Sequence, residues 1–359
     1  DRLIVDNSAC ETSSSPNFHL VSDLADFHLY FVGPDHAGRW RERVAEFATS
    51  PPWLWSPHGD ARRRGDEPLV LSEFGGWGLP RPERIATANG GDPWWFGTGR
   101  GHFRPAGWHE RFRGLGLDRV WPSLGDLAEA TQWHQFEALQ DEIGALRRQD
   151  AIQGYVVTEL CDANWEANGL LDERRGRKAY HDRLAEINAP DVVVAELERR
   201  DLRGGERLTA DVTVSSYGPV ADDGLVEAHL AIDGRPGERV SMAAGVWPQG
   251  GARSIGRLEL NVPEVDRASD AQLTLTLIDG SKRERARSSW RLAVIPDRPD
   301  APALDVAVDD PSELWNVAGR VQDVGHRLAD HGSAAVTVMT ELDSQTLRRV
   351  EDGERVLLL

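Results

Sequence analysis

The sequence has few cysteines, few tyrosines and no long hydrophobic run. Its 359 residues include only Cys10 and Cys161, too few for a disulfide framework and not spaced as a zinc site. No apolar stretch approaches the roughly 20 residues that a membrane-spanning helix needs, so we expect no membrane partner. The 11 histidines are scattered. We therefore expect no metal and no cofactor.

Positive charge is also scarce. The chain carries 41 basic and 59 acidic residues, a net charge of −18. Such a chain repels phosphate backbones, which argues against nucleic acid as a partner and against an anionic membrane surface. The length suggests two or three domains at roughly 150 residues each.

Tryptophan, in contrast, is abundant, with 13 against 4 tyrosines. Ten of them lie between Trp40 and Trp165. An indole ring stacks against the C–H face of a sugar and also fills a large core, and the core explains any single tryptophan better. The concentration in one half of the chain is more informative than any one residue.

Residues 1–189 alternate apolar strands with polar or helical stretches, which predicts a parallel sheet. In each expected strand the apolar residues come first and the chemically capable residues last, as in a (β/α)8 barrel with its site at the carboxyl ends of the strands. Four strands predict a partial barrel, since a full barrel has eight. The expected strands cover 2–8, 26–32, 68–76 and 153–162, and the expected helices cover 36–49 and 125–149.

Three further segments complete the predicted organisation. Residues 77–124 are rich in Gly, Trp and Arg, and we expect an ordered lid or substrate wall. Residues 190–295 alternate with period two in six or seven strands, which predicts an immunoglobulin-like β-sandwich. Residues 296–359 read as a linker and the start of a further α/β unit. The fold class is thus multidomain α/β plus all-β.

Glu73 ends a buried strand in "LVLSEFGGWG" and is followed by two glycines, which allow close approach of backbone and ligand. A carboxylate held rigidly at a barrel mouth suits nucleophilic attack on an anomeric carbon. The alternative is a surface or ion-paired glutamate. In "SDLADFHLYF", His28 and Tyr30 share one strand face, where a tyrosine hydroxyl could donate to the carboxylate. A core aromatic and a structural histidine are the alternatives for these two.

A second group of polar residues follows the last strand of this region, in "TELCDANWEANGLLD". It contains Glu159, Asp162, Trp165 and Glu166. A carboxylate can accept hydrogen bonds from sugar hydroxyls, and an indole can form the floor of a sugar pocket. For Glu159 and Glu166 the alternative is a polar contact that closes the barrel.

In this order, "RLIVDNS", "DFHLYF", "PLVLSEFGGWG" and "GYVVTELCDANWEANGLLDERRGRK" resemble the second half of the catalytic barrel of glycoside hydrolase family 2. That family holds β-galactosidases, β-glucuronidases and β-mannosidases. The resemblance covers 1–189, and 190–295 by architecture only. It implies that Glu73 is the nucleophile and that Tyr30 bonds to it.

The resemblance also implies supporting roles for other residues. His28 falls where relatives have an Asn or another polar residue that contacts substrate. Asp162 and Trp165 follow the strand where relatives build the sugar pocket, and Lys178 resembles a basic residue after that strand. Glu159 is a further substrate-binding or supporting candidate.

One departure from the family pattern matters. The acid/base glutamate of relatives follows an Asn, and no Asn-Glu motif precedes Glu73 here. We therefore expect a fragment of a retaining exo-β-glycosidase that acts on terminal β-galactosides, β-glucuronides or β-mannosides by double displacement. The alternative is a non-catalytic carbohydrate-binding or assembly module. Open edges of a half-barrel predict self-association, and hence a possible homo-oligomer.

Overall fold

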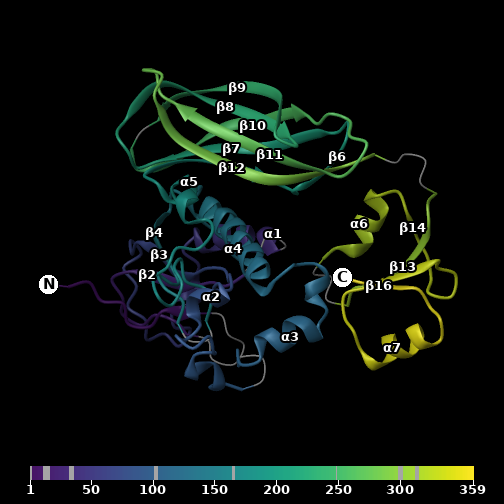
Figure 1. Cartoon of the computed structure of the whole chain (residues 1–359). Helices are drawn as coiled ribbons and strands as arrows, with labels where there is room; N and C mark the ends of the chain where they lie inside the picture. Colours follow the sequence, from purple (N-terminus) through teal and green to yellow (C-terminus); the bar gives the residue numbers. More distant parts are fainter. Residues whose placement is uncertain are drawn as a thin grey trace. The chain divides into compact units, whose positions relative to one another are not determined.

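The computed structural model describes residues 2–10, 17–31, 36–100, 104–163, 166–247, 249–297, 302–311 and 315–359. The chain divides into two compact units, Asp1–Pro296 and Asp297–Leu359. The architecture is mixed α/β with many strands (Figure 1). The boundary expected at residue 189 lies within the first unit and stays a prediction.

The first part of unit one is built on a curled half-barrel sheet of four parallel strands in the order β1-β2-β3-β4. Strand neighbours in this sheet are also neighbours in sequence, so the chain winds in one direction. The carboxyl ends of all four strands therefore point to the same edge. The strands are β1 (Ala9–Cys10), β2 (Ala25–His28), β3 (Leu69–Phe74) and β4 (Ile152–Val157).

The strand expected over residues 2–8 is wrong, because the first strand begins only at Ala9. The Ile4 amide instead donates to the Asp23 carboxylate at 2.8 Å, and the Asp23 amide donates to the Ile4 carbonyl at 2.7 Å. The side chains of Leu3 and Ile4 are exposed. The apolar run in this segment therefore pairs with the loop before β2 rather than with a strand.

Two helices pack with this sheet. Helix α1 (Ala37–Phe47) buries Trp40, Val44 and Phe47, and α4 (Leu124–Arg147) is 24 residues long. The side chain of Ser123 caps α4 by accepting from the Asp126 amide. Both helices join the strands in one core, whose largest members include Phe27, Phe47, Leu71, Phe74, Phe136 and Leu139.

In its described residues, the segment between β3 and α4 contains short helices rather than a strand. They are α2 (Pro82–Ile85) and α3 (Trp108–Gly114), with single 3-10 turns at Trp94–Gly97 and Leu117–Arg119. Phe96 and Phe112 are buried, so the segment has its own packed side chains. Beyond β4, the short helix α5 (Ala185–Asn188) leads into the next strands.

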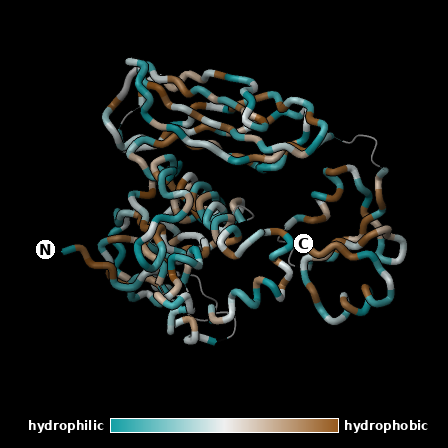
Figure 2. The backbone as a smooth tube through the Cα atoms, in the orientation of Figure 1, coloured by the Kyte–Doolittle hydropathy of each residue, from teal (hydrophilic) through white to brown (hydrophobic). Residues whose placement is uncertain are grey.

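The second part of unit one is a pair of sheets that share one core, antiparallel except that β6 pairs with β12 in parallel. The sheet orders are β10-β7-β5 and β6-β12-β11-β8-β9. Inward residues such as Val212, Leu273 and Trp290 are fully or almost fully buried. Apolar and polar segments alternate along these strands in Figure 2, as period two requires. The strands are β5 (Asp191–Leu197), β6 (Asp201–Arg203), β7 (Arg207–Ser216), β8 (Ala221–Ile232), β9 (Arg235–Trp247), β10 (Gly251–Asn261), β11 (Ser269–Ile278) and β12 (Glu284–Ile295).

In its described residues, unit two is a small parallel sheet in the order β14-β13-β15-β16 with helices α6 and α7. The Asp343 carboxylate caps α7 by accepting from the Gln345 and Thr346 amides. The elements are β13 (Asp305–Asp309), α6 (Val317–Asp323), β14 (Arg327–Leu328), β15 (Val336–Met339), α7 (Ser344–Glu351) and β16 (Val356–Leu358). In the described part of the chain, no helix combines the length and the apolar character needed to cross a membrane.

Candidate active site

The carboxyl ends of β2 and β3 bring three polar side chains together. The Tyr30 hydroxyl donates to Glu73 Oε2 at 3.0 Å, and His28 Nδ1 lies 3.3 Å from the same oxygen. The Glu73 side chain is 41% exposed. We call Glu73, Tyr30 and His28 the strand-end cluster. Its carboxylate is oriented from one side and open to a ligand from another.

The backbone explains why these side chains meet. Strands β2 and β3 are parallel neighbours, and His28 lies opposite Glu73. The Leu29 amide donates a hydrogen bond to the Glu73 carbonyl at 3.0 Å. Because side chains alternate along an extended chain, His28 and Tyr30 project to one face. The pairing register shifts between Phe27 and His28.

Gly75 allows the end of β4 to approach the end of β3. Its φ of +156° lies in the region that favours glycine, and a Cβ there would lie 2.5 Å from the Thr158 carbonyl oxygen. The Thr158 amide in turn donates to the Phe74 carbonyl at 2.8 Å. The first glycine after Glu73 is therefore required by the close backbone contact.

Further carboxyl groups lie near this cluster. Burial raises the pKa of Tyr30 to about 12, a hydrogen bond with Thr158 opposes the rise, and the charges of Glu73 and Glu166 add to it. Tyr30 is thus a hydrogen-bond donor at neutral pH. Burial, then the charge of Glu166 and a hydrogen bond with it, then the charge of Glu73, raise the pKa of Glu159. The electrostatic environment of Tyr30 is acidic.

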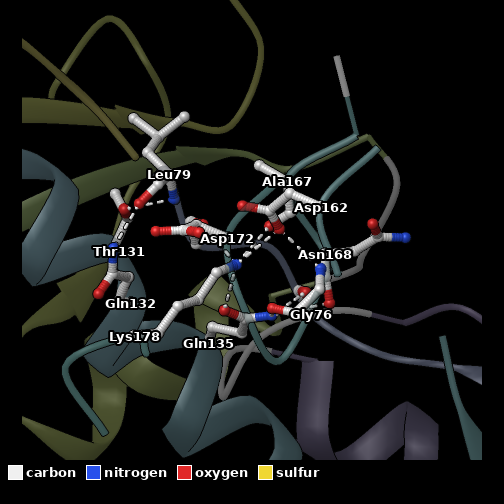
Figure 3. A network of polar contacts seen from close by, with 12 residues as sticks. Gly76, Leu79, Thr131, Gln132, Gln135, Asp162, Ala167, Asn168, Asp172 and Lys178 are labelled. Atoms are coloured by element: carbon white, nitrogen blue, oxygen red, sulfur yellow. Dashed lines mark hydrogen bonds and ion pairs between the residues drawn. The ribbon is translucent and has the colours of Figure 1, made fainter. Parts of the chain in front are cut away.

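Asp162 and Lys178 form a buried ion pair beside the turn that follows β3. Lys178 Nζ lies 2.9 Å from Asp162 Oδ1 and donates also to the carbonyls of Gly78 and Ala167, at 2.9 and 3.2 Å (Figure 3). Burial lowers the pKa of Lys178 and raises that of Asp162 to about 6, and the charge of each partner opposes the other's shift. The ammonium ties the turn after β3 to the loop after β4.

Glutamines on α4 complete this network. Gln135 Nε2 donates to the carbonyls of Gly76 and Asn168, both at 2.9 Å, and Gln135 Oε1 accepts from Lys178 at 3.2 Å (Figure 3). A Cβ on Gly78 would lie 2.6 Å from that Oε1. The loop that carries Glu159 and the turn that follows Glu73 are therefore both fixed to one helix.

Sequence reasoning missed these glutamines. Gln132 and Gln135 are 2% and 0% exposed, although the helix was expected only to be amphipathic. The available signal was two glutamines, one turn apart, among the apolar positions of a helix that follows a glycine-rich segment. Buried amides of this kind need backbone partners, and extra loop carbonyls supply them.

Sequence reasoning also missed a buried polar cluster around His19, which precedes β2 in the sequence. His19 is fully buried, with Nδ1 2.8 Å from Asp6 Oδ1 and Nε2 3.2 Å from Asp26 Oδ1. Burial opposes its charged form, but the bonds to Asp26 and Asp6 raise the pKa of His19 to about 9. Asp26 also accepts from the Ser72 hydroxyl. This cluster joins the segment before β1 to β2 and β3.

The expected site residues therefore fall into two groups. Glu73, Tyr30 and His28 meet, and Glu159 lies within electrostatic reach of Glu73. Asp162 and Lys178 bind each other. Trp165 lies outside the described residues. Within the described ranges, no three His, Cys, Asp or Glu side chains form a group that could hold a metal ion.

Comparison with known proteins gave structural neighbours only. No family model and no curated protein matches the chain. It is similar to a β-glucuronidase of Bacteroides uniformis (13% identity, TM-score 0.28, 80% of this chain and 27% of that one). It is also similar to an exo-chitosanase of Amycolatopsis orientalis (15% identity, TM-score 0.44, 77% of this chain and 31% of that one). A third similar structure is a β-D-mannosidase of Dictyoglomus thermophilum (17% identity, TM-score 0.39, 67% of this chain and 29% of that one).

The chain spans less than a third of the length of each of these three structures. At such identities and scores, the similarity assigns no activity to this chain. A functional proposal has to rest on the residues themselves.

Proposed function

We propose that this chain carries the nucleophile side of a retaining exo-β-glycosidase of the glycoside hydrolase family 2 type. The observation that carries the proposal is the strand-end cluster. A partly exposed carboxylate, Glu73, ends a parallel strand, and Tyr30 and His28 contact one of its two oxygens at 3.0 and 3.3 Å. Two contacts on Oε2 fix the carboxylate's orientation and leave Oε1 as the oxygen that we assign to the attack.

The proposed reaction has two steps. Glu73 attacks the anomeric carbon as the glycosidic bond breaks, which gives a glycosyl ester on its side chain. Water then attacks the same carbon and releases the sugar and the free carboxylate. Tyr30 holds Glu73 in line and stays protonated, since its pKa is about 12. Asp162, Lys178 and Glu159 act as supporting groups around the loop after β4.

Retention of configuration requires a second carboxyl group about 5 Å from the nucleophile, which protonates the leaving group and later activates water. The sequence has no Asn-Glu motif before Glu73. We propose that this acid/base lies in a part of the parent protein beyond this chain.

The fold supports the same proposal. Four parallel strands in sequential order are what half of a (β/α)8 barrel would show, whereas a doubly wound sheet reverses its strand order. Val156 and Leu160, on and just after β4, are 53% and 66% exposed, as expected where further strands would pack. We assign residues 1–189 to the half-barrel, 190–295 to an immunoglobulin-like sandwich and 296–359 to a partial α/β domain. The exposed residues would also favour self-association.

The test is hydrolysis of a panel of 4-nitrophenyl β-glycosides, whose good leaving group reduces the need for an acid. Glu73→Gln is the test variant and Glu42→Gln, on the exposed face of α1, is the matched control. We expect at least a burst of release from one sugar, because the first step needs no acid with this leaving group, a loss of at least about a thousandfold in Glu73→Gln and no loss in Glu42→Gln. Circular dichroism checks that both variants fold.

The panel also names the sugar among galactose, glucuronic acid and mannose. Equal rates in Glu73→Gln and the unmodified chain would contradict the proposal. If the folded chain binds sugars but the full-length parent hydrolyses none of them, the non-catalytic carbohydrate-binding module is correct instead.

A further inference from the structure

A second concave site lies in the segment between β3 and α4 and the loop after β4. It has a volume of about 390 Å³, within the range of small-molecule sites. Neither Glu73 nor Tyr30 lines it. Its lining residues are Trp94, Trp95, Thr98, Asp162, Glu173 and Arg174.

Two indoles form its apolar part. Trp94 is 81% exposed, and its ring meets that of Trp95 nearly at right angles, 88°, with centroids 6.0 Å apart. Trp95 is held by a hydrogen bond from Nε1 to Glu173 Oε1 at 3.0 Å. The pocket thus combines one fixed indole with one that offers its surface to solvent.

Two carboxyl groups form its polar part. The Asp162 side chain is 1% exposed, and its Oδ1 binds Lys178 and the Gly169 amide. Its Oδ2 and Glu173 Oε2 are buried without a hydrogen-bond partner among the described residues. A buried acceptor without a donor is unfavourable, so a ligand hydroxyl that reaches it and donates is stabilised there.

The combination selects a class of ligand. An exposed indole beside buried acceptors matches a pyranose ring, which has an apolar C–H face and hydroxyl donors at its edge. The same two carboxyl groups repel an anionic ligand. The charge of Arg174 acts on Glu173 and offsets part of this repulsion, but its Nη2 donates to the carbonyls of Ile85 and Ala86.

We propose that this pocket is a second saccharide subsite, in which an uncharged pyranose unit stacks on Trp94 and donates hydroxyl hydrogen bonds to Asp162 and Glu173. The choice of a saccharide rests on the proposed function, whereas the pocket itself does not. Asp162 then has two roles on its two oxygens: Oδ1 holds Lys178 and Oδ2 receives the ligand. The site would bind a unit of a glycan other than the unit that Glu73 attacks.

The test uses the whole chain with Glu73→Gln, so that no turnover occurs. The probes are methyl β-galactopyranoside, methyl β-mannopyranoside and methyl β-glucuronide. The readout is the indole N–H resonance of Trp95, labelled with ¹⁵N and assigned by Trp95→Phe, because that N–H binds Glu173 in the pocket. We expect a saturable shift with at least one neutral sugar and a shift at least tenfold weaker in apparent affinity with the glucuronide.

Trp94→Ala in the same background should weaken the binding by at least about tenfold. Trp94 is exposed, so this variant should fold. Trp77→Ala is the matched control: Trp77 is also exposed at 46%, but its ring faces Tyr30 at 6.3 Å. It should leave the Trp95 shift unchanged.

No shift with any neutral sugar, or an equal shift in Trp94→Ala, would overturn the subsite. The two proposals fail separately. If the Trp95 resonance shifts but the full-length parent hydrolyses no sugar, the glycosidase proposal is wrong and the subsite is supported. If the parent hydrolyses a sugar but the Trp95 resonance does not shift, the subsite is wrong and the glycosidase proposal is supported.

Discussion

Two regions near the carboxyl ends of the parallel strands β1–β4 use carboxyl groups in opposite ways. In the strand-end cluster, Glu73 contacts two side chains and is 41% exposed. Beside the buried glutamines Gln132 and Gln135 of α4, the Asp162–Lys178 pair is only 1% and 0% exposed. The partners of this pair fix the surrounding loops, and of its carboxylate only Asp162 Oδ2 has no hydrogen-bond partner among the described residues. An open carboxylate with few partners can react.

Helix α4 also carries a buried carboxyl group of its own. Glu142 is 2% exposed, and neither of its carboxyl oxygens has a hydrogen-bond partner in the described chain. Burial, with a smaller contribution from Asp141, raises the pKa of Glu142 to about 8. The side chain is therefore largely protonated at neutral pH. The two buried carboxyl groups therefore differ, because Lys178 accompanies Asp162 and no cation accompanies Glu142 among the described residues.

The largest effect should come from breaking the buried pair. Lys178→Met leaves Asp162 without its cation and removes the donor to the Gly78 carbonyl, which should lower the free energy of unfolding by about 3–5 kcal/mol. Urea unfolding at pH 7 measures it. The loss should shrink below pH 6, because Asp162, whose pKa is about 6, can then be neutral. Lys282→Met, at an exposed turn, is the control, and an equal effect of both variants would contradict a structural role for the pair.

Breaking the open cluster should act on rate rather than on stability. Tyr30→Phe removes the donor 3.0 Å from Glu73 Oε2 and should lower kcat/KM by roughly a hundredfold. The midpoint of urea unfolding should change little. Tyr217→Phe, a similarly exposed tyrosine of the sandwich, provides the comparison. A fall in stability with no fall in kcat/KM would show that Tyr30 is only a packing residue.

The smallest effect should come from Glu142→Gln, which sharpens the difference between paired and unpaired burial. The pKa of Glu142 is about 8 in the folded state and near 4.5 in the unfolded state. The folded state then holds the proton more tightly, so this group's contribution to stability falls as pH rises from about 4.5 to 8. Glutamine does not titrate, and we expect a gain in the free energy of unfolding of at least about 1 kcal/mol at pH 8 that is smaller at pH 5.

Glu137→Gln on the same helix controls for the loss of an acidic residue, since Glu137 lies near Arg200 and Arg291. It should not flatten the pH dependence. The free energy of unfolding is measured at pH 5, 7 and 8. If it depends on pH equally in Glu142→Gln and in the unmodified chain, Glu142 is ionised when buried and its pKa is not raised.

The sequence predicts much of the fold because its signals are local. Period two in 190–295 and the apolar spacing in 125–149 report directly which residues face a core. The alternation in "DFHLYF" also placed His28 and Tyr30 on one face, next to the strand that ends in Glu73. These features need no knowledge of distant contacts.

The remainder depends on contacts that are distant in sequence. The apolar residues near Ile4 suggested a strand, but the segment bonds to Asp23 instead. Gln135 can be buried because the segments that follow β3 and β4 bring the carbonyls of Gly76 and Asn168 to it. The pocket at Trp94 joins an insertion to the loop that carries Asp162. The periodicity of a single segment cannot predict contacts between residues that are distant in sequence.

The most direct test of the central claim is to trap the glycosyl ester. The chain is incubated with 2-deoxy-2-fluoro-β-glycosyl fluorides of galactose, glucuronic acid and mannose, whose activated leaving group needs no acid, and is then digested and analysed by mass spectrometry. We predict one adduct per chain, on the peptide that contains Glu73, and none in Glu73→Gln. An adduct on Glu159 or Glu166 instead, or none on this chain and none on the full-length parent, would contradict the assignment of Glu73 as the nucleophile.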